Sequence, residues 1–340
     1  MISRRGFLSG TAAGAVAGFL PGAFAASAST MDRKQRVDLA LAGQPLDRPP
    51  YTLWHHFNKP TAQEEAQYML DFHRQYDTDI VKVMNDFSYP ASSTGKWYQL
   101  KPLSSPYPKQ LETLEYVRKG LQGEAYFIDT LYGPHMTALH LLGASPEFAG
   151  KNLSEDQVGS QLQIFQRDNP QGWADMMEVI TQSTVNHIKQ ARQIGVSGAL
   201  VSIFNATSKF NSVADYEQYS RPYDKRVLDA LSGTKLTVLH LHYLERPYLA
   251  EFHDFYAPVI NYSVTTSGIP VADVRKLYAQ TIAGGVDEIH FNDLSVGQIR
   301  EQWTTARREA GNKYIITPGC SVPNSSTPEA LARLRASIVS

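Results

Sequence analysis

Residues 198–205 read Gly-Ala-Leu-Val-Ser-Ile-Phe-Asn, and residues 235–242 read Lys-Leu-Thr-Val-Leu-His-Leu-His. Both runs are short and rich in apolar and β-branched residues, which is typical of strands covered on both faces. The segment between them, residues 212–231, has the periodicity of an amphipathic helix. This order predicts two parallel strands joined by a helical crossover.

The same alternation continues along the chain from residue 50 onward. Eight β-rich runs are found, at 51–57, 79–85, 124–131, 198–205, 235–242, 258–263, 286–291 and 313–318. Helical patterns fill most of the gaps, at 107–120, 170–194, 212–231, 270–283 and 296–310. The long interval 132–197 predicts a helical insertion after the third strand. Residues 31–340 are therefore expected to form a single (β/α)₈ barrel of the TIM type, without an internal domain boundary.

The first thirty residues carry an export pattern. Residues 3–8 read Ser-Arg-Arg-Gly-Phe-Leu, a Gly/Ala-rich apolar stretch follows, and Ala23-Phe24-Ala25 offers a cleavage site. The pattern predicts a twin-arginine (Tat) signal peptide over residues 1–30 and a periplasmic protein with no stable membrane span after cleavage. Two alternatives stay open: an uncleaved anchor, and translation that starts at Met31, which would leave the protein in the cytoplasm.

Composition excludes several classes of protein. Hydrophobic residues make up 42% of the 340 residues and charged residues 19%, which is ordinary for a globular protein. The formal net charge of −1 provides no field that would gather nucleic acid or an anionic membrane. Cys320 is the single cysteine, so no disulfide forms within the chain.

Active sites of such barrels lie at the carboxyl ends of the strands, and polar residues end several of the runs. His240 and His242 are two residues apart, so both imidazoles project from the same face of a strand. Cys320 follows the eighth run at the same rim. Two imidazoles and a thiolate suit zinc and leave a coordination position open for a substrate. The alternative is that the histidines only satisfy hydrogen bonds beneath the rim.

Other polar residues at the rim are candidates for catalysis or substrate binding. Asp86 is a candidate acid/base or orienting group, or else the cap of the next helix. His55 and His56 are further catalytic candidates that would bind substrate carboxylates or pack around Trp54, and strand alternation allows only one of them to face inward. The remaining candidates are expected to bind substrate: Trp54, Asn85, Asn205 and His290.

Several of these segments together resemble the uroporphyrinogen decarboxylase superfamily, over residues 31–340. The segments are Arg36-Val37-Asp38-Leu39-Ala40-Leu41-Ala42-Gly43, Asp47-Arg48-Pro49-Pro50, residues 79–86, residues 238–242, and Ile316-Thr317-Pro318-Gly319-Cys320 followed by Thr327-Pro328-Glu329. This superfamily has a (β/α)₈ fold and includes zinc-dependent corrinoid:thiol methyltransferases, such as methylcobamide:coenzyme M methyltransferase.

The resemblance implies a role for each ligand candidate. His240 resembles the histidine of the methyltransferases' His-x-Cys zinc motif, and Cys320 resembles their distal zinc cysteine. His242 stands where that motif has cysteine. A neutral imidazole in place of a thiolate leaves the metal one unit more positive, which makes it a stronger Lewis acid.

The decarboxylase branch is similar at Asp86, which stands where that branch keeps its catalytic aspartate. That branch's arginine-bearing segment is replaced here by His-His-Phe-Asn-Lys at residues 55–59. Uroporphyrinogen carries eight carboxylates that need fixed guanidinium partners, for which histidine is a weak substitute. The departure argues against uroporphyrinogen itself as the substrate.

The sequence supports three hypotheses about the function of the protein. The first is zinc-dependent methyl transfer to a thiol, with a corrinoid or another methyl donor and a corrinoid protein as a partner. The second is cofactor-free decarboxylation of a tetrapyrrole or another carboxylated substrate, oriented by Asp86. The third is an exported, non-catalytic tetrapyrrole- or corrinoid-binding protein. The sequence leaves a homodimer open, and the export pattern indicates a substrate different from those of cytoplasmic relatives.

Overall fold

The structure is a computed structural model, and it describes residues 31–339 except 94, 149, 152 and 243–244. The predicted signal peptide, residues 1–30, lies outside the described residues. Within the described part of the chain, no helix combines the length and the apolar character needed to cross a membrane.

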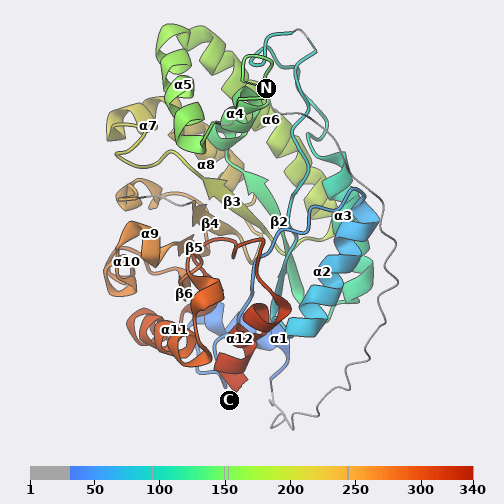
Figure 1. The fold of residues 1–340 in the computed structure, drawn as a ribbon, viewed down its shortest axis with the longest axis vertical. Coiled ribbons are helices and arrows are strands. Elements are labelled where there is room, and N and C mark those ends of the chain that lie inside the picture. Colours follow the sequence, from blue (N-terminus) through green and yellow to red (C-terminus); the bar gives the residue numbers. More distant parts are fainter. Residues whose placement is uncertain (1–30, 94, 149, 152, 243–244, 340) are drawn as a thin grey trace, which may run out of the picture.

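Seven parallel strands form one sheet in sequence order, each paired with the next. Their bounds are β1 Ile80–Lys82, β2 Tyr126–Tyr132, β3 Ala199–Ile203, β4 Val238–Leu241, β5 Val259–Tyr262, β6 Thr281–Val286 and β7 Tyr314–Pro318. Figure 1 shows these strands at the centre of the molecule with helices around them. The predicted (β/α)₈ barrel is confirmed.

The position of the eighth strand in the barrel is occupied by an irregular segment. Residues 51–57 were expected to form the first strand, but only a bridge between Tyr51 and Ile316 has strand geometry there. The Thr52 N–H donates to the Ile316 carbonyl at 3.1 Å, and the Asp79 N–H donates to the Tyr51 carbonyl at 2.8 Å. This segment therefore links β7 to β1 and closes the barrel without forming a regular strand.

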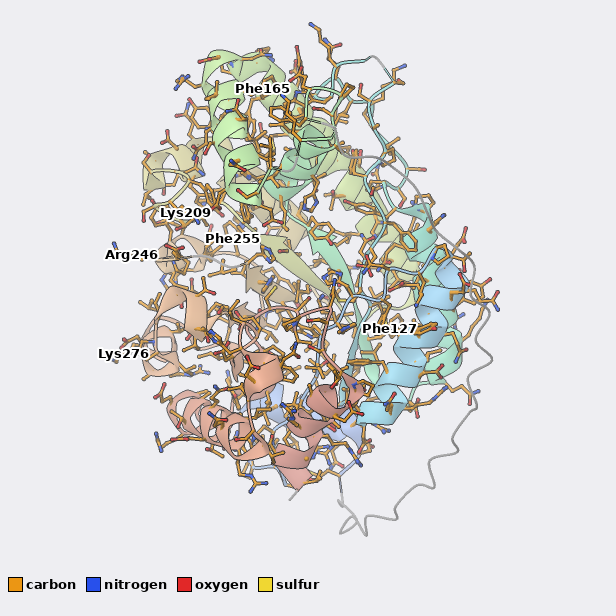
Figure 2. The ribbon with its side chains drawn as sticks, in the orientation of Figure 1. Phe127, Phe165, Lys209, Arg246, Phe255 and Lys276 are labelled. Atoms are coloured by element: carbon orange, nitrogen blue, oxygen red, sulfur yellow. The ribbon has the colours of Figure 1, made fainter. Side chains whose placement is uncertain are left out.

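Helices cover the outside of the barrel. They are α1 Arg33–Ala42, α2 Ala62–Tyr76, α3 Pro108–Leu121, α4 Pro134–Gly143, α5 Glu155–Asp168, α6 Pro170–Ile194, α7 Val213–Tyr219, α8 Arg221–Asp229, α9 Val264–Ser267, α10 Val271–Leu277, α11 Val296–Ala310 and α12 Pro328–Val339. Two short 3₁₀ turns span Leu249–Phe252 and Phe291–Asp293. Phe127 on β2 points toward α2 and α3 in Figure 2 and packs with Met69 and Leu114. Three helices, α4 to α6, lie in the long interval between β2 and β3.

One predicted strand is displaced. The run at 286–291 was expected to be the seventh strand, whereas β6 spans Thr281–Val286 and the predicted helix at 270–283 ends at Leu277. Gly284 and Gly285 lie inside β6, where glycine normally weakens a strand pattern. Gly285 is required there, because it has φ +95° and a Cβ would lie 2.5 Å from the Cβ of Ala306 on α11.

The barrel interior is filled by an apolar layer with one residue from each strand. The layer is part of a buried cluster and consists of Ile80, Ile128, Leu200, Val238, Val259, Ala283 and Ile315. Successive side chains of a strand alternate between the two faces, so residues two positions later also point inward. That next layer, nearer the carboxyl ends, carries the candidate site.

Candidate metal centre

The inward-facing layer above the apolar floor is polar. Its members lie two residues after those of the floor and are all buried: Lys82, Thr130, Ser202, His240, Asn261 and Thr317. Polar side chains are seldom gathered inside a barrel unless hydrogen bonds or a ligand satisfy them. This polar layer therefore forms the base of the candidate site.

Three predicted ligands converge at this layer. The ligand atoms of His240, His242 and Cys320 all lie within 4.8 Å of one another. Nδ1 of His242 lies 3.3 Å from Nε2 of His240 and 3.4 Å from Sγ of Cys320. Tetrahedral zinc with N ligands at about 2.0 Å and an S ligand at about 2.3 Å places neighbouring ligand atoms roughly 3.3–3.6 Å apart. The donor set fits zinc, and the two separations that involve His242 have the tetrahedral spacing.

Asn261 on β5 orients His240. The Nδ2 group of Asn261 donates to the carbonyls of Ala283 and Pro318 and to the Thr317 hydroxyl, at 3.0, 3.3 and 3.1 Å. Its Oδ1 atom is left to accept a hydrogen bond from Nδ1 of His240. The Nδ1 nitrogen of His240 therefore carries the proton, and Nε2 presents a lone pair toward His242. Such a contact behind a histidine ligand fixes both its tautomer and its ring orientation.

The two imidazoles are neutral. Burial lowers the pKa of His240 well below its usual value, and the neighbouring His242 lowers it further. Burial also lowers the pKa of His242 to about 3, with His140 adding to the effect. Neutral imidazole is the form that binds a metal ion, so protons do not compete for these nitrogens near neutral pH.

Glu288 holds the segment that carries Cys320. Its carboxylate, 1% exposed, accepts a hydrogen bond of 3.1 Å from the N–H of Gly319. A Cβ at position 319 would lie 2.5 Å from the Glu288 carboxylate, so only glycine allows this approach. Burial raises the pKa of Glu288.

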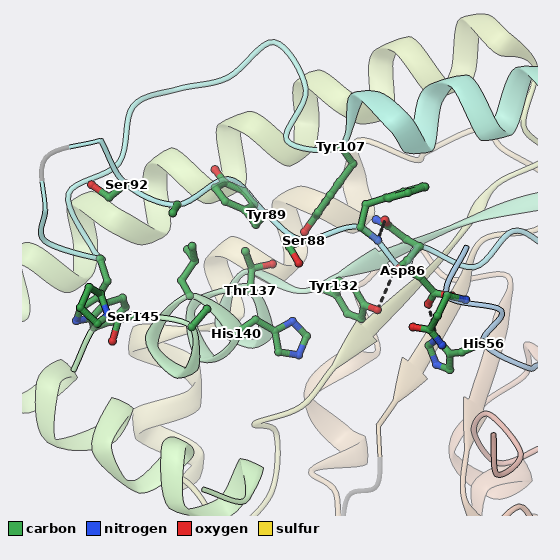
Figure 3. Close-up of a pocket in the computed structure, with 18 of the residues that line it drawn as sticks. His56, Asp86, Ser88, Tyr89, Ser92, Tyr107, Tyr132, Thr137, His140 and Ser145 are labelled. Carbon is green, nitrogen blue, oxygen red and sulfur yellow. Dashed lines mark hydrogen bonds and ion pairs between the residues drawn. The ribbon is translucent and has the colours of Figure 1, made fainter. Parts of the chain in front are cut away.

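The ligand cluster lines a cavity of about 440 Å³ that also contains Trp54, Lys82 and Glu288. A second cavity, of about 540 Å³, adjoins it and shares His56, Tyr132 and His140 with it. Figure 3 shows the second cavity, with Tyr89, Tyr107 and Tyr132 among its lining side chains. Both volumes are typical of small-molecule sites.

His56 and Asp86 form a pair at the junction of the two cavities (Figure 3). Nδ1 of His56 lies 2.5 Å from Oδ1 of Asp86, and the N–H groups of Phe57 and Asn58 donate to Oδ2 at 3.2 and 3.0 Å. Burial tends to raise the pKa of Asp86, but the hydrogen bonds from His56 and the two amides outweigh it and hold the pKa below its usual value. An ionised Asp86 accepts the Nδ1 proton, which leaves Nε2 of His56 able to accept another.

Of the two adjacent histidines, only His56 faces the cavities, as strand alternation predicts. His55 points to the opposite side, where its ring lies 5.5 Å from that of Phe57 and 6.2 Å from that of Phe72. Burial lowers the pKa of His55. The expectation that His55 serves catalysis is not supported by this position.

Two of the four predicted substrate-binding residues line the cavities, and the other two lie elsewhere. Trp54 lines the metal cavity, with its ring 6.0 Å from that of His240, and Asn85 lines the second cavity. Asn205 is fully buried and donates to the Ser220 hydroxyl at 2.6 Å, away from the lining of both cavities. His290 is exposed and pairs with Asp287 at 2.8 Å, because the displaced β6 ends before it. Asn205 and His290 therefore line neither cavity.

Sequence reasoning missed Lys82 and Asn261. Each lies two residues after an apolar residue of a buried strand, Ile80 or Val259, so each falls at an inward position. A polar residue at that spacing in a strand buried on both faces was the available signal. Tyr132 and His140, shared by the two cavities, come from β2 and α4 and had no comparable signal.

Replacing Asn261 with leucine is expected to weaken zinc binding about 10- to 100-fold, because His240 loses the acceptor that fixes its tautomer. Competition with a chromophoric chelator measures the dissociation constant. Asn205→Leu is the matched control, since it also removes a buried amide but lies outside the cavities. Equal metal affinities in the two variants would contradict the orienting role of Asn261.

The structure defines the chain as a parallel barrel that carries a cluster of two histidines and a cysteine, able to hold a metal ion, at the carboxyl ends of its strands. The chain belongs to the uroporphyrinogen decarboxylase (URO-D) family, whose model matches residues 84–339. This assignment confirms the resemblance seen in the sequence.

Individual relatives are distant. The chain is 25% identical over 142 residues to uroporphyrinogen decarboxylase from Geobacter sp. strain M21, a match that covers 42% of this chain and 39% of that protein. It is 26% identical over 133 residues to uroporphyrinogen decarboxylase from Syntrophotalea carbinolica, over 39% and 36% of the two chains. The chain thus spans less than half the length of these curated relatives.

Solved structures share the fold. A methyltransferase from Methanosarcina mazei aligns with a TM-score of 0.67 at 13% identity, over 90% of this chain and 98% of that one. A B12-independent methionine synthase from Shewanella sp. W3-18-1, solved in complex with selenomethionine, aligns with a TM-score of 0.53 at 13% identity, over 86% and 94% of the two chains.

Proposed function

We propose that this protein is a zinc-dependent methyltransferase that activates a thiol substrate. The observation that carries the proposal is the convergence of ligand atoms of His240, His242 and Cys320 within 4.8 Å of one another, with His242 Nδ1 3.3 and 3.4 Å from the other two. A zinc ion held by these three groups would act as a Lewis acid that lowers the pKa of a thiol in the remaining position. Methyltransferases among the solved structures of this fold support the proposal.

The chain's own residues would prepare the thiol for transfer. Asn261 holds His240 in the tautomer that presents Nε2. His56, oriented by Asp86, lines the metal cavity and would accept the thiol proton at Nε2. Asp86 is a positioning residue in this scheme, because it acts on the substrate only through His56.

The contacts of Asp86 favour this scheme over decarboxylation of a tetrapyrrole. The decarboxylase hypothesis requires the Asp86 carboxylate to accept hydrogen bonds from substrate N–H groups. Both of its oxygens are already engaged, by His56 and by two backbone amides, and its side chain is only 4% exposed. A substrate would have to displace three hydrogen bonds to reach it.

The methyl donor in this proposal is a corrinoid carried by a partner protein, or another small methyl donor. The second cavity meets the metal cavity at His56, Tyr132 and His140, so a donor group placed there would face a thiol at the metal centre. Enzymes gain from holding two reacting groups in such a fixed relation.

Metal analysis tests the proposal. The mature protein purified from its native compartment is expected to contain about one zinc per chain, and the His240→Ala, Cys320→Ser double variant to contain none. Cobalt-loaded protein is expected to change its visible absorption when a thiol is added. A metal-free protein with full activity would refute zinc dependence.

We also propose that the protein is exported through the twin-arginine pathway, on the strength of the Arg4-Arg5 motif and the Ala23-Phe24-Ala25 site. Fractionation of cells that express the Arg4→Lys, Arg5→Lys variant decides this. Export of the variant at the wild-type level would count against the proposal.

A further inference from the structure

The second cavity, which adjoins the metal cavity, is lined largely by aromatic rings. Tyr89, Trp97, Tyr107, Tyr132 and the imidazole of His140 all contribute to its walls, and Figure 3 shows the three tyrosines and His140 around it. The rings of Tyr89 and Tyr107 lie 6.0 Å apart at an interplanar angle of 85°, and those of Tyr132 and His140 lie 5.0 Å apart at 80°. Two rings at right angles form a corner, which suits a rounded group better than a flat one.

The backbone that carries Tyr107 is anchored by a chain of hydrogen bonds. Its N–H donates to Oγ of Ser105 at 3.1 Å, and that oxygen lies 2.8 Å from Nδ1 of His187. Nε2 of His187 lies in turn 2.8 Å from Oδ2 of Asp129, and both of these side chains are buried. A wall that is ordered before the ligand enters costs less free energy on binding.

The second cavity carries a negative charge of its own. Among the described residues that line it, Asp86 has the one carboxylate and none is lysine or arginine. Asp86 is held in its ionised form by His56 and two backbone amides, and His56 on its own is neutral in this arrangement. Burial lowers the pKa of His140, so this ring adds no positive charge near neutral pH.

The charged groups of the metal cavity do not reverse this sign. They are Lys82, Glu155, Glu288 and Cys320. Burial lowers the pKa of Lys82 to about 8 against the opposing charges of Cys320 and Asp86, so Lys82 contributes one positive charge near neutral pH. A zinc ion held there by two neutral imidazoles, the Cys320 thiolate and a substrate thiolate adds no net charge.

The two carboxyls of the metal cavity outweigh that single cation when they are counted with Asp86. Burial raises the pKa of both Glu155 and Glu288. Glu155 is exposed at the start of α5, where a helix N-terminus favours its ionised form. Glu288 adds no positive charge in either protonation state. The two cavities together therefore have an excess of negative charge, which a cationic ligand offsets.

We propose that the second cavity binds a methylated onium group, a quaternary ammonium or a sulfonium, on a small molecule. Such a cation has no N–H or S–H group, so it does not have to displace the hydrogen bonds that occupy Asp86. Aromatic rings attract it at short range and the carboxylate attracts it at longer range. A volume of about 540 Å³ accommodates a molecule of this size.

A role for this molecule as the methyl donor rests on the proposed function, in which it takes the place of a corrinoid. The thiolate sulfur forms a bond to the methyl carbon while the C–N or C–S bond of the onium group breaks. The electron pair of the broken bond stays on nitrogen or sulfur, and a neutral amine or thioether leaves. This transfer needs no oxidant, reductant or further proton.

The binding test compares choline with 3,3-dimethylbutan-1-ol by isothermal titration on the full mature chain as purified. The two molecules have the same shape, and only choline is charged. We expect the wild type to bind choline about 10- to 30-fold more tightly, which corresponds to roughly 1.4–2 kcal/mol. Tetramethylammonium and trimethylsulfonium are titrated in the same way, and the tighter of the two identifies the kind of onium group.

Tyr89→Leu is expected to weaken choline binding about 5- to 10-fold and to leave the affinity for the neutral alcohol within about twofold. Tyr89→Phe keeps the ring and should keep most of the preference. Asp86→Asn keeps the volume and should also weaken the binding of choline alone, so it serves if the leucine variant folds poorly. Tyr116→Leu, at an exposed position on α3, is the matched control and should behave like the wild type.

The donor role has its own readout. The zinc-loaded mature chain is incubated with 2-mercaptoethanol and with trimethylsulfonium or tetramethylammonium whose methyl groups are deuterated. Mass spectrometry is expected to detect the deuteromethyl thioether of 2-mercaptoethanol. Its absence would overturn the donor role, even where the preference for choline is intact.

Failure of the inference differs from failure of the proposed function. If the wild type binds choline and the neutral alcohol equally, or if Tyr89→Leu and Asp86→Asn both keep the full preference, the assignment of the second cavity is wrong. Thiol activation would still stand on the response of the cobalt spectrum to a thiol. If no thiol changes that spectrum, thiol activation and the donor role are wrong, whereas onium binding is decided by the titrations alone.

Discussion

The Cys320→Ser variant is expected to bind zinc about 100- to 1,000-fold more weakly than the wild type and to lose methyl transfer in proportion. Structural zinc sites gain roughly 10–16 kcal/mol from four ligands, so one ligand contributes on the order of 3–4 kcal/mol. A neutral hydroxyl replaces this contribution poorly, because the metal loses the only anionic ligand among the three. Isothermal titration or chelator competition measures the affinity, and initial rates at saturating thiol measure the transfer.

The fold should survive this substitution. Serine is close to cysteine in size, Cys320 is 6% exposed, and it lies after β7 in a segment that Glu288 already holds through Gly319. The melting temperature of the metal-free variant should match that of the metal-free wild type. His290→Ala removes an exposed histidine outside the cavity and should leave zinc affinity unchanged. If Cys320→Ser bound zinc with the wild-type affinity, Cys320 would not be a zinc ligand.

The fold was predictable because its signal is distributed over the chain. Seven of the expected runs overlap or adjoin strands, since parallel strands buried on both faces must be rich in apolar residues. The predictions that failed concern single segments, and each has a physical cause. β6 contains Gly284-Gly285 because α11 approaches it closely, and that requirement outweighed strand propensity. The segment at 51–57 closes the barrel with few backbone contacts. The pattern of apolar side chains does not predict that this segment lacks regular strand geometry.

The candidate site was predictable where spacing alone fixes geometry. His240 and His242 share a face because they are two residues apart at the end of β4, and Cys320 follows β7 at the same rim of the barrel. Lys82 and Asn261 were missed because a polar residue inside an apolar run has no partner that the sequence reveals. Only the layer structure of the barrel shows that both face the ligand cluster.

The segments that carried the family resemblance near the N-terminus have a structural role in this protein. Arg36, Asp47, Arg48 and Asp79 meet in one ion-pair network that lies before β1, at the end of the barrel opposite the metal cavity. Residues at the amino ends of barrel strands more often serve stability than catalysis. The network joins α1, the closing segment and β1 through a few buried groups.

Asp79 is the centre of that network. Its carboxylate is fully buried and accepts from Nη1 of Arg36 at 2.6 Å, from Nη1 of Arg48 at 2.5 Å and from the N–H of Tyr51 at 2.9 Å. Burial tends to lower the pKa of Arg36, yet its pairing with Asp47 and Asp79 raises that pKa above the usual value. The Arg36 guanidinium therefore stays charged, and it shares the Asp79 carboxylate with Arg48.

Asp79→Asn is expected to lower the free energy of unfolding by about 3–5 kcal/mol, because the neutral amide keeps the volume but removes the buried carboxylate that Arg36 and Arg48 share, which leaves Arg36 with Asp47 and takes the carboxylate partner from Arg48. The midpoint and slope of urea denaturation measure the change. Asp77→Asn is the matched control two residues earlier, since Asp77 pairs with Arg33 at a side-chain exposure of 38% and should contribute less than about 1 kcal/mol. Equal losses in the two variants would mean that burial of the network contributes nothing, and that closure of the barrel rests on its backbone hydrogen bonds alone.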